Sequence, residues 1–266
     1  MTPAEVEFLR RLAGDKPAWR KNDGIAARMG AIHGLGSVRG SRVHYAAGDH
    51  ARAGDMLRNR GFEQTALAGA YTRDAAPAGF SEKHGALPVM HEMVAVVPIG
   101  IHTDIVAPPD GFVSMAWSEA IQLSYEVLLV CENLQPLFLL RHYLWLGEFI
   151  KNRPTLALFR GTVEIFGTEA PAKLVAADNR PTLAFFDFDP KGLSMAASLP
   201  RREALCMPPW PELEAVTRQK RRENLYLQSV HTSRAHLDKV DDPEIATAWL
   251  RLKVLTMGLN QESFPR

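Results

Sequence analysis

The spacing of apolar residues changes along the chain. In about the first 60 residues, apolar positions recur at helical spacing, as at Val6, Leu9 and Leu12, a period typical of amphipathic helices. Helices followed by a small strand and a basic helix are typical of a winged-helix-like module, which often places one helix against DNA. The pattern predicts helices over residues 3–13, 23–33 and 48–60, a turn-rich loop over 34–40 and a strand over 42–45.

After residue 125 the pattern switches to short, uniformly apolar runs that are separated by helical stretches. Uniform apolarity is typical of strands that are buried on both faces of a parallel sheet. The order strand–helix–strand predicts such a sheet with right-handed crossovers. The expected strands span residues 127–131, 155–159 and 182–186, and the expected helices span 134–150, 169–177 and 190–199.

Between these two patterns, residues 65–85 are rich in Ala, Gly and polar residues, which predicts a linker. Residues 93–101 predict a strand, and residues 102–113 predict a loop with a return strand. We therefore expect an α/β protein in two parts. An N-terminal α/β region for DNA binding or interaction spans residues 1–115, and a Rossmann-like parallel sheet with flanking helices spans residues 116–266.

Composition narrows the class of protein. The 266 residues are 46% hydrophobic, which is enough for a sizeable core in one or two domains. No apolar run reaches the roughly 18 to 20 residues of a membrane span, and the start of the chain lacks the apolar core of a signal peptide. We therefore expect a cytoplasmic protein without a membrane partner. Its two cysteines, Cys131 and Cys206, imply no disulfide framework.

The net charge of +1 hides an uneven distribution. Residues 1–62 contain eleven Lys and Arg against six Asp and Glu, whereas residues 63–130 contain two against eight and residues 131–266 eighteen against sixteen. A basic N-terminal segment could contact phosphates, although an ordinary solvated surface fits the same counts. The candidate DNA-binding residues in this segment are Arg39, Arg42, Arg52 and Arg58.

Two of the apolar runs end abruptly in acidic residues. Glu132 follows the first run, and Asp187 and Asp189 follow the third. An acid at the end of a buried strand is costly to desolvate unless something neutralises it. Three such acids from neighbouring strands would form a site for a hard cation such as Mg²⁺, which prefers oxygen ligands. The competing interpretation is a set of helix caps and loop acids, and Asp189 before a proline fits an N-cap by itself.

The residues after the third run favour phosphate. Gly192 allows a close backbone approach at the start of the next helix, whose N-terminus attracts anions. Lys191 is a candidate for a DNA phosphate contact, and a solvated turn lysine is an equally good interpretation.

The acids form a recognisable constellation. Glu132 after the first strand, Gly161 after the second and Asp187-Phe-Asp189 after the third resemble the Toprim domain of topoisomerases, primases and certain nucleases. The longer string Asp187-Phe-Asp-Pro-Lys-Gly192 looks like the version in type IIB topoisomerase A subunits and their relatives, the JetD-like nuclease subunits of Wadjet plasmid-defence systems. The ending Leu259-Asn-Gln-Glu262 is similar to the Leu-Glu-Gln-Glu ending of JetD-like proteins, with Asn260 in place of the acid. The resemblance covers about residues 125–266.

The resemblance implies a C-terminal Toprim domain that acts as a metal-dependent DNA endonuclease, a hydrolase, in anti-plasmid defence. It implies Mg²⁺ or Mn²⁺ held by Glu132, Asp187 and Asp189, with Glu262 as a further catalytic residue, although Glu262 also fits polar surface. It also implies DNA and an SMC-type motor complex as partners, and it leaves a homodimer open. Asn260 in place of an acid would alter the binding of a second ion.

Two other functions stay open at this stage. A topoisomerase-like transesterase would use a tyrosine nucleophile, for which the candidates are Tyr45 and Tyr71. Neither lies in the expected paired-tyrosine context, and Tyr45 fits a core strand, so hydrolysis is favoured. The remaining alternative is a non-catalytic Toprim scaffold that binds nucleic acid or a protein partner.

Overall fold

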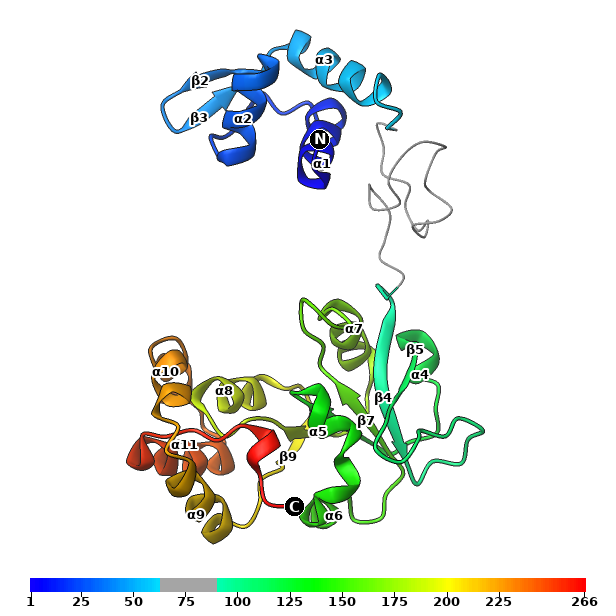
Figure 1. Ribbon diagram of the computed structural model, residues 1–266, viewed down its shortest axis with the longest axis vertical. Coiled ribbons are helices and arrows are strands. Elements are labelled where there is room, and N and C mark those ends of the chain that lie inside the picture. The colour runs from blue at the N-terminus through cyan, green and yellow to red at the C-terminus, as the bar shows by residue number, and fades with distance from the viewer. Residues whose placement is uncertain (63–89) are drawn as a thin grey trace. The chain divides into compact units, whose positions relative to one another are not determined.

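Three helices and a small antiparallel sheet make up residues 1–62 in the computed structural model, which describes residues 1–62 and 90–266 (Figure 1). Thr2 and Asp23 cap the first two helices by accepting hydrogen bonds from backbone amides of the first turn. The strand order is β1-β3-β2. The elements are α1 (Pro3–Gly14), β1 (Trp19–Lys21), α2 (Gly24–His33), β2 (Ser37–Arg39), β3 (Arg42–His44) and α3 (Ala47–Arg58).

The predicted helices of this unit are confirmed, but the predicted loop over residues 34–40 is wrong in part because it contains β2. β1 was also missed. Each strand has only three residues, and Val43 is the buried apolar residue of the central strand. The strand predicted over residues 42–45 is confirmed as β3, whereas β1 and β2 are too short to show an alternation that a sequence pattern can register.

A six-stranded mixed sheet organises residues 90–266, in the order β5-β4-β7-β6-β8-β9. The pairs β6–β7, β6–β8 and β8–β9 are parallel, whereas β4 pairs antiparallel with both β5 and β7. The α/β class is therefore confirmed, and the parallel strands expected after residue 116 form one part of a mixed sheet that also includes β4 and β5. The strands are β4 (Met93–Ile99), β5 (Val113–Ala116), β6 (Val127–Cys131), β7 (Thr155–Phe159), β8 (Thr182–Phe185) and β9 (Arg202–Leu205).

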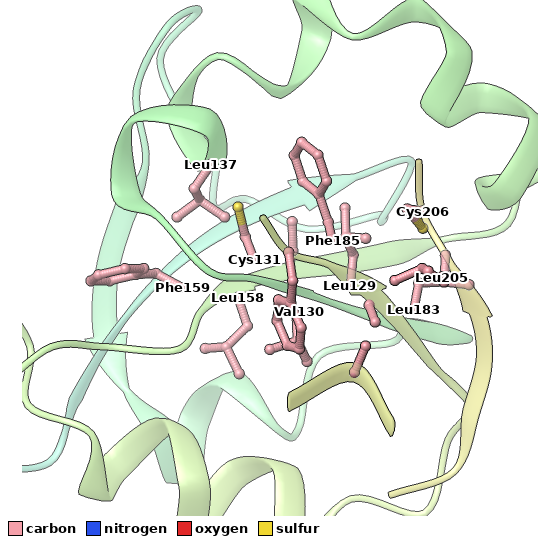
Figure 2. Packing of buried hydrophobic residues seen from close by; sticks show 14 of the residues in the cluster. Leu129, Val130, Cys131, Leu137, Leu158, Phe159, Leu183, Phe185, Leu205 and Cys206 are labelled. Carbon is pink, nitrogen blue, oxygen red and sulfur yellow. The ribbon is translucent and has the colours of Figure 1, made fainter. Parts of the chain in front are cut away.

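Helical segments cover both faces of this sheet. Figure 2 shows Cys131 and Phe185 on the same side of the sheet as Leu137, while Val130 and Leu158 point to the other side. Because both faces of the sheet are covered, the sequences of the central strands consist of almost unbroken apolar residues. The helices are α4 (Trp117–Ala120), α5 (Leu134–Phe138), α6 (Gly147–Ile150), α7 (Glu169–Ala177), α8 (Pro190–Ser198), α9 (Trp210–Lys220), α10 (Glu223–Leu237) and α11 (Pro243–Leu255), with 3₁₀ turns η1 (Leu140–His142), η2 (Leu144–Leu146) and η3 (Gln261–Ser263).

The helix predicted over residues 134–150 is broken into α5, η1, η2 and α6. The backbone leaves the helical region at Leu139 (φ −101°, ψ 14°) and at Tyr143 (φ −92°, ψ 75°). The Tyr143 ring packs edge-to-face on Phe185, with ring centroids 5.3 Å apart. Tertiary packing of this aromatic residue therefore outweighs the helical propensity of the segment.

The chain divides into two compact units, residues 1–89 and 90–266. This division differs from the expected boundary at 115/116 because β4 and β5 pair into the sheet of the second unit. The predicted linker over residues 65–85 lies outside the described residues. Among the helices of the described residues, none combines the length and apolarity needed to span a membrane.

Candidate functional site

The carboxyl ends of β6 and β8 bring the predicted acids together. These two strands are parallel neighbours in the centre of the sheet, so Glu132 and Asp187 follow them at the same edge. The amide of Glu132 continues the ladder by donating to the carbonyl oxygen of Phe185 at 3.0 Å. Ligands of α/β sheets bind at this edge.

Glu132 is buried, with 5% of its surface exposed. Its Oε2 accepts a hydrogen bond from the amide of Asp187 at 3.1 Å, and Arg160 Nη2 lies 3.5 Å from its Oε1. Burial raises the pKa of Glu132 above its ordinary value, although the amide hydrogen bond and the Arg160 charge oppose the rise. One backbone donor and one arginine thus leave this carboxylate only partly compensated.

Asp187 is held by two donors on a single oxygen. Its Oδ1 accepts from the side-chain amide of Asn133 at 3.0 Å and from the backbone amide of Gln261 at 2.8 Å. Burial is the main cause that raises the pKa of Asp187 to about 8, and the charges of Glu132, Asp189 and Glu262 add to it. This carboxyl therefore keeps its proton near neutral pH unless a cation lies beside it.

Asp189 caps α8, as the competing interpretation expected. Its Oδ1 accepts from the amide of Gly192 at 2.6 Å. Burial raises the pKa of Asp189, while the amide of Gly192 and the ammonium of Lys191 lower it. A Cβ at Gly192 would lie 2.2 Å from the carbonyl oxygen of Asp187, so the close approach of α8 to the acid segment requires glycine. Capping does not separate Asp189 from the cluster, because its charge also raises the pKa of Glu132 and Asp187.

The C-terminal segment lies against the acid segment. Phe188 and Leu259 exchange two backbone hydrogen bonds of 2.8 and 2.9 Å. Gln261 is fully buried, and its side chain accepts from the amide of Asn133 at 2.8 Å and donates to the carbonyl oxygen of Phe185 at 2.7 Å. Gln261 therefore connects the ends of β6 and β8.

Asn260 and Glu262, the two neighbours of Gln261, form a hydrogen bond with each other. Glu262 Oε2 accepts from Asn260 Nδ2 at 2.7 Å, and Asn260 Oδ1 accepts from Arg222 Nη1 at 3.1 Å. The charge of Glu262 reaches Asp187, whose pKa it raises. The structure thus brings the four predicted acids into one electrostatic cluster, with Glu262 at its margin.

Sequence reasoning missed Asn133, Arg160 and Gln261 as members of this site. Asn133 and Arg160 directly follow the predicted strands, and Gln261 lies inside the C-terminal string that carried the resemblance. Position at a strand end was the available signal. The Nε of Arg160 is buried and has no hydrogen-bond partner in the described residues. Such an unsatisfied buried donor is expected where a bound anion supplies the missing hydrogen bond.

As it stands, the cluster is not a preformed ion cage. Within residues 1–62 and 90–266, no three or more His, Cys, Asp or Glu side chains are arranged to hold a metal ion. Oxygens of Glu132, Asp187 and Asp189 are directed at backbone amides instead. The donor set nevertheless fits a hard cation, because it consists of carboxylate oxygens and carries mutual repulsion that a cation would relieve.

One comparison with known proteins gives a family. The family described as a domain of unknown function, DUF7281, matches residues 89–264. The chain belongs to the DUF7281 family. No curated protein and no solved structure matches the chain. The DUF7281 segment contains the whole second unit except its last two residues, and therefore the whole acid cluster.

The remaining predicted residues lie before the DUF7281 segment, on the first unit. Arg52 donates to the carbonyl oxygen of Gly34 at 3.0 Å and pairs with Asp49, and Arg58 pairs with Asp55. Both arginines thus have acidic partners on α3. Tyr45 is 2% exposed and belongs to the core, and burial raises the pKa of its hydroxyl. Tyr71 lies outside the described residues.

Proposed function

We propose that the protein is a Mg²⁺- or Mn²⁺-dependent DNA endonuclease with a Toprim-like domain, similar to the JetD-like subunits of Wadjet anti-plasmid systems. The observation that carries the proposal is the convergence of Glu132, Asp187 and Asp189 at the carboxyl ends of β6 and β8. The strand-end acids and the Leu-Asn-Gln-Glu ending occur in the order that the resemblance requires. DNA and an SMC-type motor are the proposed partners, the latter by resemblance alone.

Cleavage of a phosphodiester adds negative charge to a phosphate that is already negative, so the site must supply positive charge. A divalent cation held by carboxylates supplies that charge and activates water at neutral pH. The hydrogen bonds of Asp187 in the described residues lie on Oδ1, so its other oxygen would be available to hold a cation. Glu132 and Asp189 would complete the oxygen set.

Two basic residues would position the phosphate. Arg160 lies beside Glu132 and has a buried Nε without a hydrogen-bond partner in the described part of the chain, so a phosphate oxygen would satisfy it. Lys191 is exposed in the first turn of α8, and its charge acts on the pKa of both Glu132 and Asp189. Both groups act on the acids of the cluster and are therefore the candidates to contact a phosphate bound there.

A transesterase that uses Tyr45 is disfavoured by the burial of that residue, because a nucleophile must reach the phosphate. A non-catalytic scaffold would have the same fold and would bind DNA or a protein partner without cleaving DNA. The three functions differ in what happens to DNA when metal is added.

The test is plasmid nicking and linearisation by the full chain with Mg²⁺, with Mn²⁺ and with EDTA. We expect metal-dependent cleavage by the wild type and none by Asp187→Ala or Asp189→Ala. The matched control is Asp241→Ala, which removes an exposed acid before α11 and should cleave like the wild type. Wild-type cleavage by both site variants would refute the proposal. Labelled DNA that migrates with the protein on a denaturing gel would support the transesterase, and metal binding without cleavage would support the scaffold.

A further inference from the structure

The basic residues of the first unit fall into two groups. Four arginines on the helices have acidic partners, whereas no ion pair of the described residues includes Lys21, Arg39 or Arg42, all of which lie on the small sheet and are exposed. Three exposed cations without a charge partner in the described residues therefore lie together on the sheet. The paired arginines are Arg11 with Glu7, Arg28 with Glu5, Arg52 with Asp49 and Arg58 with Asp55.

The register of the sheet places these three cations in one row. Arg42 on the central strand pairs with Lys21 on one side and with Arg39 on the other. Residues directly opposite each other across antiparallel strands project from the same face, with Cβ atoms about 5 Å apart. Like charges at such positions destabilise the sheet, so the fold maintains a repulsive row that an anion would relieve.

An aromatic row lies next to the cation row on the same face. Trp19 and His44 are cross-strand partners with ring centroids 4.7 Å apart. Trp19 is 39% exposed, and the guanidinium groups of Arg42 and Arg39 lie 5.6 and 5.9 Å from its ring centroid. We call this surface the Trp19 face, defined by Trp19, Lys21, Arg39, Arg42 and His44. It belongs to the three-stranded sheet whose β2 and β3 are labelled in Figure 1.

We propose that the Trp19 face binds single-stranded DNA, with a base stacked on Trp19 and its phosphates on Lys21, Arg39 and Arg42. An aromatic platform beside a cationic track is the arrangement by which proteins bind single strands without sequence preference. The bases of a duplex already stack on each other, so only an unpaired base gains from an exposed indole ring. The inference rests on the proposed function in taking DNA as the polymer.

The proposed DNA contacts of the first unit therefore lie on its small sheet and not on α3. Arg39 and Arg42 remain DNA-binding candidates, and Lys21 and Trp19 join them. Arg52 joins α3 to the carbonyl of Gly34 and to Asp49, so its charge is already used within the fold.

The test is a titration of labelled oligothymidine with the full chain in EDTA, measured by fluorescence anisotropy at several salt concentrations. The double variant Arg39→Gln/Arg42→Gln should bind more weakly and lower the slope of log affinity against log salt by about 1.4, since each lost phosphate contact on a single strand contributes about 0.7. Trp19→Ala should weaken binding by about 5- to 150-fold, the loss of one stacked base. Trp19→Phe keeps a ring and should retain most of the affinity.

The matched control is Arg11→Gln/Arg60→Gln, which removes two exposed positive charges of the same unit, one on α1 and one in the turn after α3. Circular dichroism checks that each variant is folded. Equal loss of affinity in both double variants would overturn the assignment to the Trp19 face. Tighter binding of the duplex than of the single strand would overturn the single-strand assignment. Displacement of oligothymidine by polyglutamate of equal total charge, with equal affinity, would also overturn it and would assign the face to an acidic protein.

The binding assay and the cleavage assay distinguish a failure of the Trp19-face proposal from a failure of the proposed nuclease function. Asp241→Ala should bind oligothymidine and cleave plasmid like the wild type, because this exposed acid belongs to neither the acid cluster nor the Trp19 face. Loss of binding in the Trp19-face variants with intact cleavage of plasmid would still support the face and leave the proposed nuclease unaffected.

Discussion

Asp187→Asn tests whether the acid cluster stores repulsion that a cation is needed to relieve. Asparagine keeps the carbonyl oxygen that accepts hydrogen bonds from Asn133 and Gln261 and removes the charge. In the wild type, burial and the Glu132 charge raise the pKa of Asp187 from 3.8 to about 8. One pKa unit corresponds to about 1.4 kcal/mol, so ionised Asp187 costs the fold at most about 6 kcal/mol. Glu132 shares that cost, because the two groups titrate together.

The sign of the pH dependence follows from the direction of the shift. Below pH about 4 the carboxyl is protonated in both the folded and the unfolded chain and contributes nothing. Between pH about 4 and about 8 the unfolded chain releases the proton more readily than the folded chain, so the wild type loses stability as the pH rises. The free energy of unfolding of Asp187→Asn should therefore exceed that of the wild type by an amount that grows across this window and is constant above it.

The assay is urea denaturation in EDTA from pH 4 to pH 9, followed by tryptophan fluorescence. Four of the five tryptophans belong to the second unit, so the signal reports the unfolding of the site. Added Mg²⁺ should stabilise the wild type more than Asp187→Asn, since a bound ion stabilises the folded state that it binds. Asp242→Asn is the control with the opposite sign, because backbone amides and Arg202 lower the pKa of Asp242. A variant Asp187→Asn that is no more stable than the wild type at pH 8 would refute the reasoning.

Three further substitutions follow from the structure. Gly192→Ala should destabilise the second unit by about 1–3 kcal/mol in urea denaturation, because its Cβ would lie 2.2 Å from the carbonyl oxygen of Asp187. Gln261→Ala should cost about 1–3 kcal/mol for each buried partner left unpaired, among them the amide of Asn133; a cost below 1 kcal/mol would contradict this role. Tyr45→Phe should keep both stability and cleavage, since the buried hydroxyl has no hydrogen-bond partner in the described residues; loss of cleavage would revive the transesterase.

Uniform apolarity was a reliable guide to the central strands. The predicted runs 127–131 and 155–159 match β6 and β7 at both ends, and β8 ends one residue before the predicted run does. The pattern could not give strand direction for β4, because antiparallel pairing with β7 depends on how the chain returns across the sheet and not on local periodicity. Of the three-residue strands of the first unit, β3 was predicted, whereas β1 and β2 were not, since their pairing is decided by contacts between distant residues.

The acids of the site were predictable because their chemistry is costly wherever it is buried. Glu132, Asp187 and Asp189 stood out at the ends of apolar runs. Their neutral partners did not stand out, because an amide side chain such as that of Asn133 or Gln261 reads as ordinary polar surface until the fold shows what it contacts. Gln261 reaches the cluster only because residues 258–259 pair with other parts of the chain, through Phe188 and Arg222.

The distribution of compensating groups is the strongest physical argument for a cationic ligand at the acids. Backbone amides satisfy oxygens of Glu132, Asp187 and Asp189, yet the pKa of each remains raised. A purely structural cluster would gain stability by replacing one acid with its amide, since neutral isosteres of buried ionic groups are often neutral or stabilising. The chain instead retains repulsion among the acids of the second unit. In the described part of the first unit it also retains a row of cations that form no ion pair. The two proposals would account for both departures from maximal stability: a bound cation would neutralise the acids, and DNA phosphates would neutralise the Trp19 face.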